Sequence, residues 1–310
     1  MATPTPDDSA TPEPATTAGH PVRPGALYVV ATPIGNLGDL SPRARDVLAA
    51  VDRIAAEDTR TSGQLLAHFG IQRPLVALHE HNEDRIAAEL VRQLQAGQSL
   101  ALISDAGTPL ISDPGFALVR AARAAGVPAY AVPGPCAAVA ALSVSGLPSD
   151  AFVFAGFLPP KQAARRARLE ELGRDSRTVI VYESAHRIAE SLADVVAVLG
   201  PQRPVALSRE LSKRFEESFS GSAAGLAAWQ AADPNRGRGE FVLLIGAAEK
   251  AADAAEGERV LRLLLRELPP SAAARLAAEI TGAPRKALYA AALRLGGAGP
   301  SENGDNGAPA

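Results

Sequence analysis

The sequence predicts an α/β protein built on a largely parallel sheet with helices on both faces. Two observations support this prediction. Short apolar runs alternate with segments whose apolar residues recur at helical spacing, as in residues 86–94. Loops rich in Gly and Pro directly follow three of the apolar runs, at residues 32–40, 104–115 and 133–137. In a parallel sheet such loops leave the carboxyl ends of the strands, where ligands usually bind.

Composition narrows the class of protein. The chain has 310 residues, of which 47% are hydrophobic and 21% charged, as expected of a globular protein with about two domains. The single cysteine, Cys136, excludes a disulfide framework and a cysteine-based zinc site, and it fits a cytoplasmic location. No apolar run approaches the roughly twenty residues of a membrane span. The net charge of −3 means that any nucleic-acid contact must rest on local basic patches.

The first α/β domain is expected over residues 25–133, after a tail at 1–24 whose composition predicts disorder. Ser41 and Pro42 have the residue types of a helix N-cap and first turn. Asn82 is expected to cap a later helix, and Pro114 to lie in the first turn of the helix that follows the 103–115 loop. The strands of this domain are expected at residues 27–31, 51–56, 75–78, 99–103 and 129–132.

A second α/β domain is expected over residues 134–246, and it opens with an Ala-rich helix that ends at Gly146. After a linker, short helices over residues 256–296 resemble a helix-turn-helix arrangement, with Ser271 as an expected N-cap. Residues 297–310 are expected to be disordered. The strands of the second domain are expected at residues 152–154, 178–182, 205–207 and 241–245.

Two stretches carry a local excess of positive charge. Residues 161–177 hold six basic and three acidic side chains, and residues 256–296 hold seven basic and four acidic ones. A solvated helix face explains either stretch alone, whereas two such stretches in an acidic protein favour contacts with RNA phosphates.

Several motifs are absent or incomplete. The chain has no Gly-x-Gly-x-x-Gly after its first strand and no Walker lysine motif, which excludes a typical nicotinamide dehydrogenase and a P-loop NTPase. His79 and His81 have a spacing that suits a metal, but no second cluster completes a tetrahedral site, and no metal is expected. Asp58 and Arg60 follow a strand end, where they form either a salt-bridged terminus or part of a cleft.

Six segments occur in an order that resembles the tetrapyrrole methylase superfamily. More narrowly, they resemble the ribosomal RNA small subunit methyltransferase I family, which methylates a cytidine 2′-hydroxyl with S-adenosylmethionine. The resemblance covers about residues 25–295. Position 31 is Ala where many relatives have Gly, and position 136 is Cys where Ser or Thr is common. The segments are Ala31–Asn36, Ala56–Arg60, Ile103–Gly115, Pro133–Pro135, Tyr182–Arg187 and Glu240–Val242.

The resemblance implies a two-domain α/β enzyme, usually a homodimer, that holds S-adenosylmethionine in a cleft between its domains and acts on 16S rRNA in the small ribosomal subunit. Backbone groups freed by the Gly/Pro loops suit the donor's carboxylate, ammonium and adenine edge. Asp105 or Asp113 would accept hydrogen bonds from the donor's ribose hydroxyls or ammonium. The other donor contacts implied are Pro33, Gly35, Gly107, Thr108, Pro109, Ser112, Cys136, Ala137 and Tyr182.

The acceptor chemistry adds one hypothesis. A ribose 2′-hydroxyl is a poor nucleophile until its proton begins to leave, so a positioned base would help. We favour Asp58 as this base or as a hydroxyl-orienting acceptor, with Arg60 holding a neighbouring phosphate or Asp58 itself. In the alternative, Asp58 and Arg60 form a structural pair and positioning alone suffices. The competing functions are methylation of a tetrapyrrole ring carbon and a non-catalytic RNA-binding role.

Overall fold

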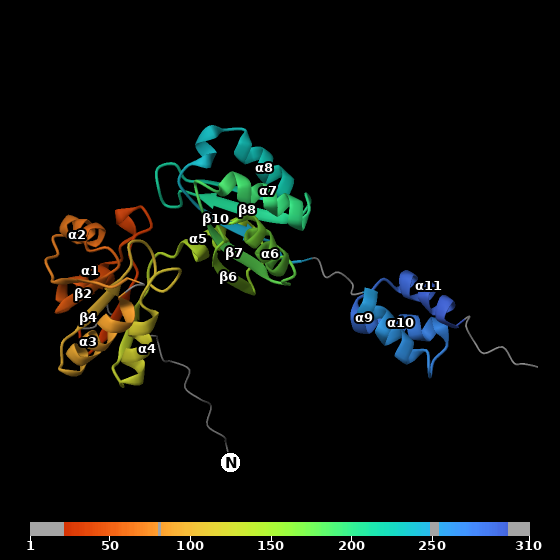
Figure 1. Ribbon diagram of the computed structural model, residues 1–310, viewed down its shortest axis with the longest axis horizontal. Helices are drawn as coiled ribbons and strands as arrows, with labels where there is room; N and C mark the ends of the chain where they lie inside the picture. Colours follow the sequence, from red (N-terminus) through yellow and green to blue (C-terminus); the bar gives the residue numbers. More distant parts are fainter. Residues whose placement is uncertain (1–21, 80–81, 249–253, 297–310) are drawn as a thin grey trace, which may run out of the picture. The chain divides into compact units, whose positions relative to one another are not determined.

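The computed structural model describes residues 22–79, 82–248 and 254–296. These residues form two compact units (Figure 1). The first contains two five-stranded sheets and spans the described residues up to 170 together with 178–246. The second contains residues 171–177 and the C-terminal helices. The predicted tails at 1–21 and 297–310 lie outside the described residues, and no described helix is long and apolar enough to cross a bilayer.

The first sheet is parallel throughout, as the sequence predicts, in the order β3-β2-β4-β1-β5. All five strands therefore end at one edge, and their carboxyl-end loops gather there. The strands are β1 (Leu27–Val30), β2 (Arg53–Ala56), β3 (Leu75–Ala77), β4 (Leu100–Ile103) and β5 (Ala129–Val132).

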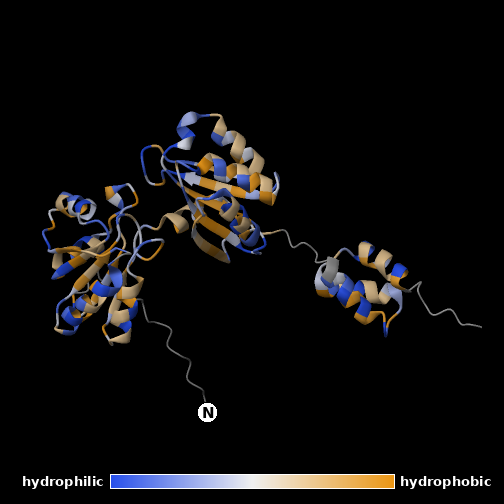
Figure 2. Cartoon of the chain, viewed as in Figure 1, coloured by the Kyte–Doolittle hydropathy of each residue, from blue (hydrophilic) through white to orange (hydrophobic). Residues whose placement is uncertain are grey.

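Helices cover both faces of this sheet (Figure 1). The alternation of side chains along β4 shows why. Ala101 and Ile103 pack into the core with α1 (Pro42–Ala50) and α2 (Thr59–His68). Leu100 and Leu102 point the other way, toward α3 (Glu83–Gln95) and α4 (Phe116–Ala124). A strand buried on both faces must be apolar throughout, and Figure 2 shows the strands largely apolar between their helices.

The start of α4 differs from the expectation. Pro114 precedes the helix rather than entering its first turn, because Gly115 takes a φ of +124°, which is not helical. The Glu83 carboxylate replaces a local cap by accepting from three backbone N–H groups at this helix start, among them that of Gly115 at 3.0 Å. An interaction between residues this far apart in sequence leaves no local signal.

Two of the three expected caps differ as well. Ser41 caps α1 as predicted, since its hydroxyl accepts from the Ala44 N–H at 3.1 Å. Asn82 stands at the N-cap position of α3 but makes no capping bond, because its side chain instead bonds the backbone of His79 and Ala77. Ser271 does not cap, since that helix begins at Pro270.

The second sheet is mixed, in the order β6-β7-β10-β8-β9, and only β6 and β7 run parallel. The sequence does not predict the edge strand β9, because its residues Glu-Ser-Phe-Ser-Gly-Ser are mostly polar and only partly buried. The strands are β6 (Phe152–Phe157), β7 (Thr178–Ser184), β8 (Pro204–Arg209), β9 (Glu217–Ser222) and β10 (Glu240–Ile245). The helices are α5 (Ala137–Ser145), α6 (Gln162–Leu172), α7 (Ile188–Leu199) and α8 (Ala223–Ala231).

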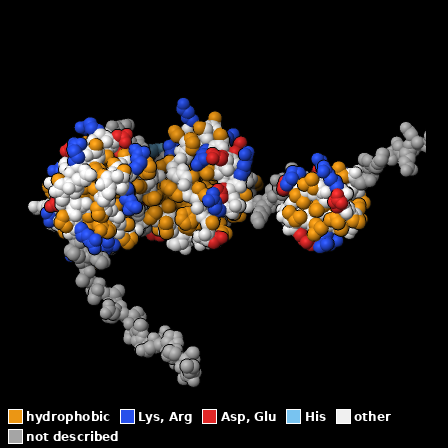
Figure 3. All heavy atoms as spheres, turned by 90° about the horizontal axis from the view of Figure 1, so that it is seen from below, with side chains coloured by type: hydrophobic (Ala, Val, Ile, Leu, Met, Phe, Trp, Pro, Cys, Tyr) orange, Lys and Arg blue, Asp and Glu red, His pale blue; other side chains and the backbone are white. Residues whose placement is uncertain are grey.

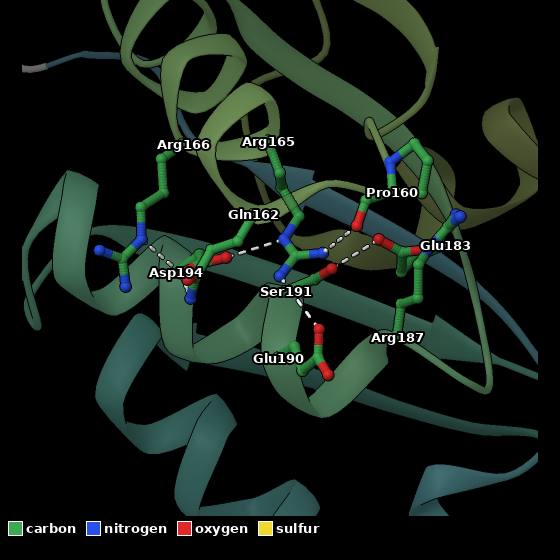
Figure 4. Close-up of polar contacts among 9 residues, drawn as sticks. All are labelled: Pro160, Gln162, Arg165, Arg166, Glu183, Arg187, Glu190, Ser191 and Asp194. Carbon is green, nitrogen blue, oxygen red and sulfur yellow. Dashed lines mark hydrogen bonds and ion pairs between the residues drawn. The ribbon is translucent and has the colours of Figure 1, made fainter.

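A buried ion pair joins α6 to α7 (Figure 4). The Arg165 Nε lies 2.8 Å from the Asp194 Oδ2, and both side chains are almost wholly buried. Burial alone would raise the pKa of Asp194, but hydrogen bonds from Arg166 and Arg165 outweigh it and hold the pKa below its usual range. Arg165 therefore cannot contact an RNA phosphate, which removes one cation from the basic stretch at 161–177.

Three helices, α9 (Ala254–Leu264), α10 (Pro270–Thr281) and α11 (Arg285–Gly296), form the C-terminal helical unit. Small side chains let them approach closely, and its core includes Leu261, Ala274, Leu288 and Ala292. Gly282 ends α10 in the left-handed conformation at a φ of +73°, which makes the turn into α11. The helical unit expected at 256–296 is thus present as a helix-turn-helix arrangement.

Candidate active site

A cavity of about 490 Å³ lies within the first compact unit, at the carboxyl-end loops of the first sheet. One wall comes from the loop between β4 and α4, at residues 106–108 and 111–113. The opposite wall comes from the second sheet, at the end of β7 with the two residues after it (182–186) and at the start of β10 with the residue before it (239–242). Cys136 and Ala137, at the start of α5, also line it. The cavity has the size of a typical small-molecule site.

The structure brings together most of the residues predicted to contact a donor. Pro33, Gly35, Asp105 and Pro109 do not line the cavity, and Gly35 is covered by the side chain of Lys213. The residues that line it are Gly107, Thr108, Ser112, Asp113, Cys136, Ala137 and Tyr182. Their role in binding a donor remains a prediction, because proximity to a cavity does not identify its ligand.

Hydrogen bonds to backbone groups hold the three Gly/Pro loops together. Thr32 and Gly107 exchange N–H···O bonds of 2.8 and 3.1 Å, and the Thr108 hydroxyl donates to the Pro135 carbonyl at 2.9 Å. Gly107 has a φ of +86°, and Leu110 and Ser112 also have positive φ values, of 74° and 67°. Such backbone conformations are costly for residues other than glycine and concentrate at functional sites.

Three carboxylates line the cavity, and no Lys or Arg is among its lining residues in the described chain. Glu183 is buried and bonds Arg187, with Nη2 2.7 Å from its Oε1, and Ser191 at 2.6 Å (Figure 4). Glu240 pairs with Lys213, whose Nζ lies 2.9 Å from its Oε2. These two charges are therefore neutralised by cations held outside the cavity.

Asp113 is different, because no ion pair with Lys or Arg is found for it among the described residues. Burial raises the pKa of its carboxyl to about 6, Ser104 opposes this by hydrogen bonding, and the charge of Asp105 adds to it. Near neutral pH the cavity therefore holds one carboxylate that no protein cation compensates. Such a site favours a ligand with positive charge.

Tyr182 supplies an aromatic surface in the same wall. Its hydroxyl accepts from the Ala138 N–H at 3.2 Å, and burial raises the pKa of this phenol to about 12, so the side chain is neutral. Phe157, which also lines the cavity, meets the Tyr182 ring edge to face at 5.6 Å between centroids. At an interplanar angle of 68°, the two rings form an apolar corner of the cavity, in which the face of one ring can stack on a planar ligand.

Comparison with known proteins identifies the family. Residues 26–227 match the family model of tetrapyrrole (corrin/porphyrin) methylases, and residues 251–296 match that of the RsmI C-terminal HTH domain. The chain is 60% identical over 268 residues to ribosomal RNA small subunit methyltransferase I of Xylella fastidiosa strain Temecula1, covering 86% of this chain and 98% of that one. The chain belongs to the ribosomal RNA small subunit methyltransferase I family.

Other comparisons agree with this assignment. The proteins of the same name from Pseudomonas aeruginosa and Escherichia coli O157:H7 are 54% and 52% identical, covering 88% of this chain and 98% and 96% of theirs. Among solved structures, the methyltransferase CobJ matches with a TM-score of 0.53 at 19% identity, over 72% of this chain and 95% of that one. This likeness shows the fold alone. It confirms the predicted fold class.

The segment of this family that includes Asp58 lies beside the cavity rather than in it. Asp58 caps α2 by accepting from the Arg60 N–H at 2.7 Å, and its carboxylate lies 3.3 Å from Arg60 Nη2. These bonds hold the pKa of Asp58 below its usual range. The Asp58 N–H in turn donates to Asp105 Oδ1 at 3.1 Å. Through these bonds both aspartates hold the backbone of this corner.

Sequence reasoning missed several residues of the cavity. Glu183, His186 and Glu240 belong to segments that carry the family resemblance, so a signal for them existed. Phe157 and Leu211 had no signal, because only the folded second sheet brings them to the first. Among the described residues no three His, Cys, Asp or Glu side chains gather as a metal site, and His81 lies outside that part of the chain.

Proposed function

We propose that this chain transfers a methyl group from S-adenosylmethionine to the 2′-hydroxyl of a cytidine in 16S rRNA of the small ribosomal subunit. The observation that carries the donor assignment is the uncompensated Asp113 in a cavity whose lining, among the residues that the structure describes, contains no Lys or Arg. S-adenosylmethionine carries a sulfonium and an ammonium against one carboxylate, so it is a cation overall. The names of the family's members support the RNA acceptor.

The residues present fit this donor. The ionised Asp113 would accept hydrogen bonds from its ammonium or its ribose, and the loop at 106–108 offers backbone groups to its polar edges. The face of either Phe157 or Tyr182 would lie against adenine, since the two rings meet edge to face. A phosphate backbone would find no cation in this lining, so we place the RNA outside the cavity, with only the acceptor ribose at its mouth.

Methyl transfer from a sulfonium needs an in-line approach and little covalent help, so the work of the chain is to hold two substrates in line. Asp58 as a general base remains a proposal, which rests on its position just after a strand of the first sheet. The contacts of Asp58 fit the alternative interpretation, in which Asp58 and Arg60 form a structural pair. The pKa of Asp58 is also lowered, which makes its carboxylate a weaker base.

The helical unit offers a surface for RNA. At 100° per residue, Tyr289, Leu293 and Lys286 fall on one arc of α11, away from the buried Leu288 and Ala291. Arg285 lies at the edge of this arc, next to the buried Ala292. Tyr289 is 43% exposed, and neither Arg285 nor Lys286 forms an ion pair with a carboxylate in the part of the chain that is described. Figure 3 shows apolar side chains exposed between Lys and Arg on this unit. Cations beside an exposed aromatic ring suit phosphate contacts and base stacking.

The direct test is transfer of labelled methyl groups from S-adenosylmethionine to small ribosomal subunits and to naked 16S rRNA, with the product mapped to a nucleotide. We expect a single 2′-O-methylcytidine in the subunit sample. A methylated base, or no transfer to either RNA while a tetrapyrrole precursor is methylated, would contradict the proposal. Calorimetric titration with S-adenosylmethionine alone checks donor binding separately from the acceptor.

Truncation after Ala248 tests the role of the helical unit. We expect unchanged donor affinity and strongly reduced methylation, because the deleted residues 256–296 carry a net positive charge. RNA affinity should also depend less steeply on salt, by roughly 0.7 to 0.9 in the logarithmic slope for each phosphate that the truncated chain no longer neutralises.

Two double variants test whether the unpaired cations of the helical unit cause the change in salt dependence. Arg285→Ala with Lys286→Ala should reproduce part of the change in slope. Arg275→Ala with Glu279→Ala removes a paired cation and its partner from the same unit and should leave the slope unchanged. Equal slopes for the full chain and the truncation would make this unit a structural appendage.

The family resemblance also suggests a cytoplasmic homodimer. Light scattering during size-exclusion chromatography should give twice the 31.9 kDa of one chain. A monomer that methylates subunits at full rate would contradict the dimer and leave the proposed reaction intact.

A further inference from the structure

The loop between β8 and β9 fastens the two sheets to each other beside the cavity. Within it Glu210 and Ser212 have φ values of 50° and 67°, which residues other than glycine rarely adopt. Leu211 lines the cavity, and the Ser212 hydroxyl donates to the Asp39 carboxylate in the loop after β1. Such strained backbone conformations persist only where the surrounding contacts hold the loop in place.

Lys213, in the same loop, contacts both sides of the cavity region. Its Nζ lies 3.0 Å from Glu210 Oε1 and 2.9 Å from Glu240 Oε2, so the ammonium sits between two carboxylates. Its stem lies over Gly35 so closely that a Cβ built there would be 2.4 Å from Lys213 Cγ. The head of this side chain therefore holds one wall of the cavity, at Glu240, while its stem covers the loop after β1.

We propose that Lys213 is a positioning residue for methyl transfer, which acts by fixing the Glu240 carboxylate at the cavity wall and by holding the Gly35 loop against the second sheet. The inference rests on the function proposed above. Lys213 is not among the residues that line the cavity, so it acts through Glu240 and Gly35 rather than on a substrate.

The contacts favour positioning over catalysis by a base. Burial alone would lower the pKa of Lys213, but hydrogen bonds and charge from Glu240 and Glu210 outweigh it, so the pKa is raised and the ammonium keeps its proton. An ammonium that stays charged cannot accept a proton from a hydroxyl. It can hold a carboxylate in place, and it prevents repulsion between Glu210 and Glu240.

The same contacts favour positioning over a purely structural role. The Glu240 side chain is 80% exposed, so its ion pair with Lys213 adds little to stability. Glu210 is only 18% exposed, but its carboxylate keeps the hydrogen bond from the Glu240 N–H when the ammonium is lost. A small displacement of groups that orient substrates can nevertheless slow a reaction by about a hundredfold. Loss of the ammonium should therefore change the rate far more than the fold.

The test compares Lys213→Met, which keeps most of the stem and removes the charge, with Glu240→Gln and with the double variant. Wild-type enzyme is measured first, for donor binding by calorimetry and for single-turnover methylation of small subunits. We expect each single variant to lower the rate by about tenfold or more while donor affinity stays within about threefold. The double variant should lose no more than either single one, because both act through one pair.

Two further variants complete the test. Lys213→Arg should restore part of the rate, because a guanidinium can also bridge two carboxylates. Arg123→Met, which removes an exposed cation on α4 far from these residues in sequence, should leave the rate unchanged.

The outcomes separate this inference from the function on which it rests. A wild-type enzyme that binds no S-adenosylmethionine would overturn both. An active wild type with an equally active Lys213→Met variant would overturn the positioning role alone. So would losses that multiply in the double variant, or a rate that falls only in proportion to the folded fraction seen by circular dichroism.

Discussion

The two walls of the cavity are built in different ways. The wall from the first sheet comes from loops whose backbone is unusual, since Gly107 and Ser112 have positive φ values, and it contributes the uncompensated Asp113. The wall from the second sheet contributes two carboxylates, Glu183 and Glu240, and each of them is paired with a cation that does not line the cavity. The first wall thus presents an unpaired negative charge to a ligand, while the carboxylates of the second wall are already neutralised by protein cations.

This difference has a physical consequence. A backbone wall is sensitive to any added side chain, whereas a wall of paired charges is sensitive to the loss of one partner. Substitutions in the two walls should therefore affect stability and donor binding differently.

Glu183→Gln should have the largest effect, on stability. Its carboxylate is fully buried and accepts from Ser184 N, Arg187 and Ser191, so an amide there leaves Arg187 without its counter-charge (Figure 4). We expect the free energy of unfolding in urea to fall by about 3 kcal/mol.

Asp194→Asn is the matched control for Glu183→Gln. It breaks the neighbouring buried network, around Arg165, and should cost a similar amount. Asp194 does not line the cavity, so only Glu183→Gln should also weaken binding of S-adenosylmethionine. Equal donor affinities in the two variants would show that the second wall does not contact the ligand.

Gly107→Val tests the backbone wall. A side chain here projects toward Ile34, whose Cγ2 would be 3.3 Å from the new Cβ, and fills space at the cavity. Donor affinity should fall by at least about thirtyfold, or about 2 kcal/mol. Because Gly107 also has a φ of +86°, valine strains the backbone as well.

Gly126→Val separates that strain from the loss of the cavity. Gly126 has a φ of +72°, and a Cβ there would meet nothing within 4 Å. Both variants should lose about 1–2 kcal/mol of stability, but only Gly107→Val should lose donor binding. If Gly126→Val weakened donor binding equally, general strain would explain both results.

The same contrast explains what the sequence could predict. The first wall was predictable because its signals are local: an apolar strand, then Gly107, Pro109 and Gly115 in a loop at the carboxyl end of a parallel sheet. Seven of the eleven residues expected to contact a donor line the cavity, all but Tyr182 in loops or helix starts that follow strands of the first sheet.

The second wall was far less predictable, because its parts meet only through tertiary structure. In the sequence Lys213 has no feature that distinguishes it from other charged loop residues. Its contact with Gly35 exists only in the folded structure. The strand β9, which closes the loop that carries Lys213, has a polar sequence without a clear period. Likewise, the sequence places Arg165 in a basic stretch suited to RNA, but its partner Asp194 on α7 buries it.

Asp113→Asn should produce a smaller and pH-dependent effect. The pKa of Asp113 is raised to about 6, so its charge is present above that pH and is lost as the pH falls through it. At about pH 8 the variant should bind the cationic donor about tenfold more weakly than wild type. Below about pH 5 the two should bind alike, since both side chains are then neutral.

The stability of the Asp113→Asn variant should change in the opposite sense. A carboxyl whose folded pKa is raised destabilises the folded state as it ionises, so wild type loses stability as the pH rises from about 4 toward 7. The variant should be slightly more stable than wild type at neutral pH in thermal melts.

For donor binding, the contradicting outcome is a ratio of wild-type to variant donor affinities that stays constant from about pH 5 to about pH 8. That result would show that Asp113 does not face the donor's charge.

Asp58→Asn should have the smallest effect, and it separates the two interpretations of this residue. Asparagine is nearly isosteric and caps helices as well as aspartate, so the bond to the Arg60 N–H survives. The exposed ion pair with Arg60 is removed, which should change stability little. Because Asp58 lies outside the cavity lining and its pKa is lowered, we expect a single-turnover methylation rate within about threefold of wild type. A rate at least about tenfold lower, with donor and RNA affinities unchanged, would instead support Asp58 as the base. Loss of both affinities together would show that this corner holds the first wall in place through Asp105.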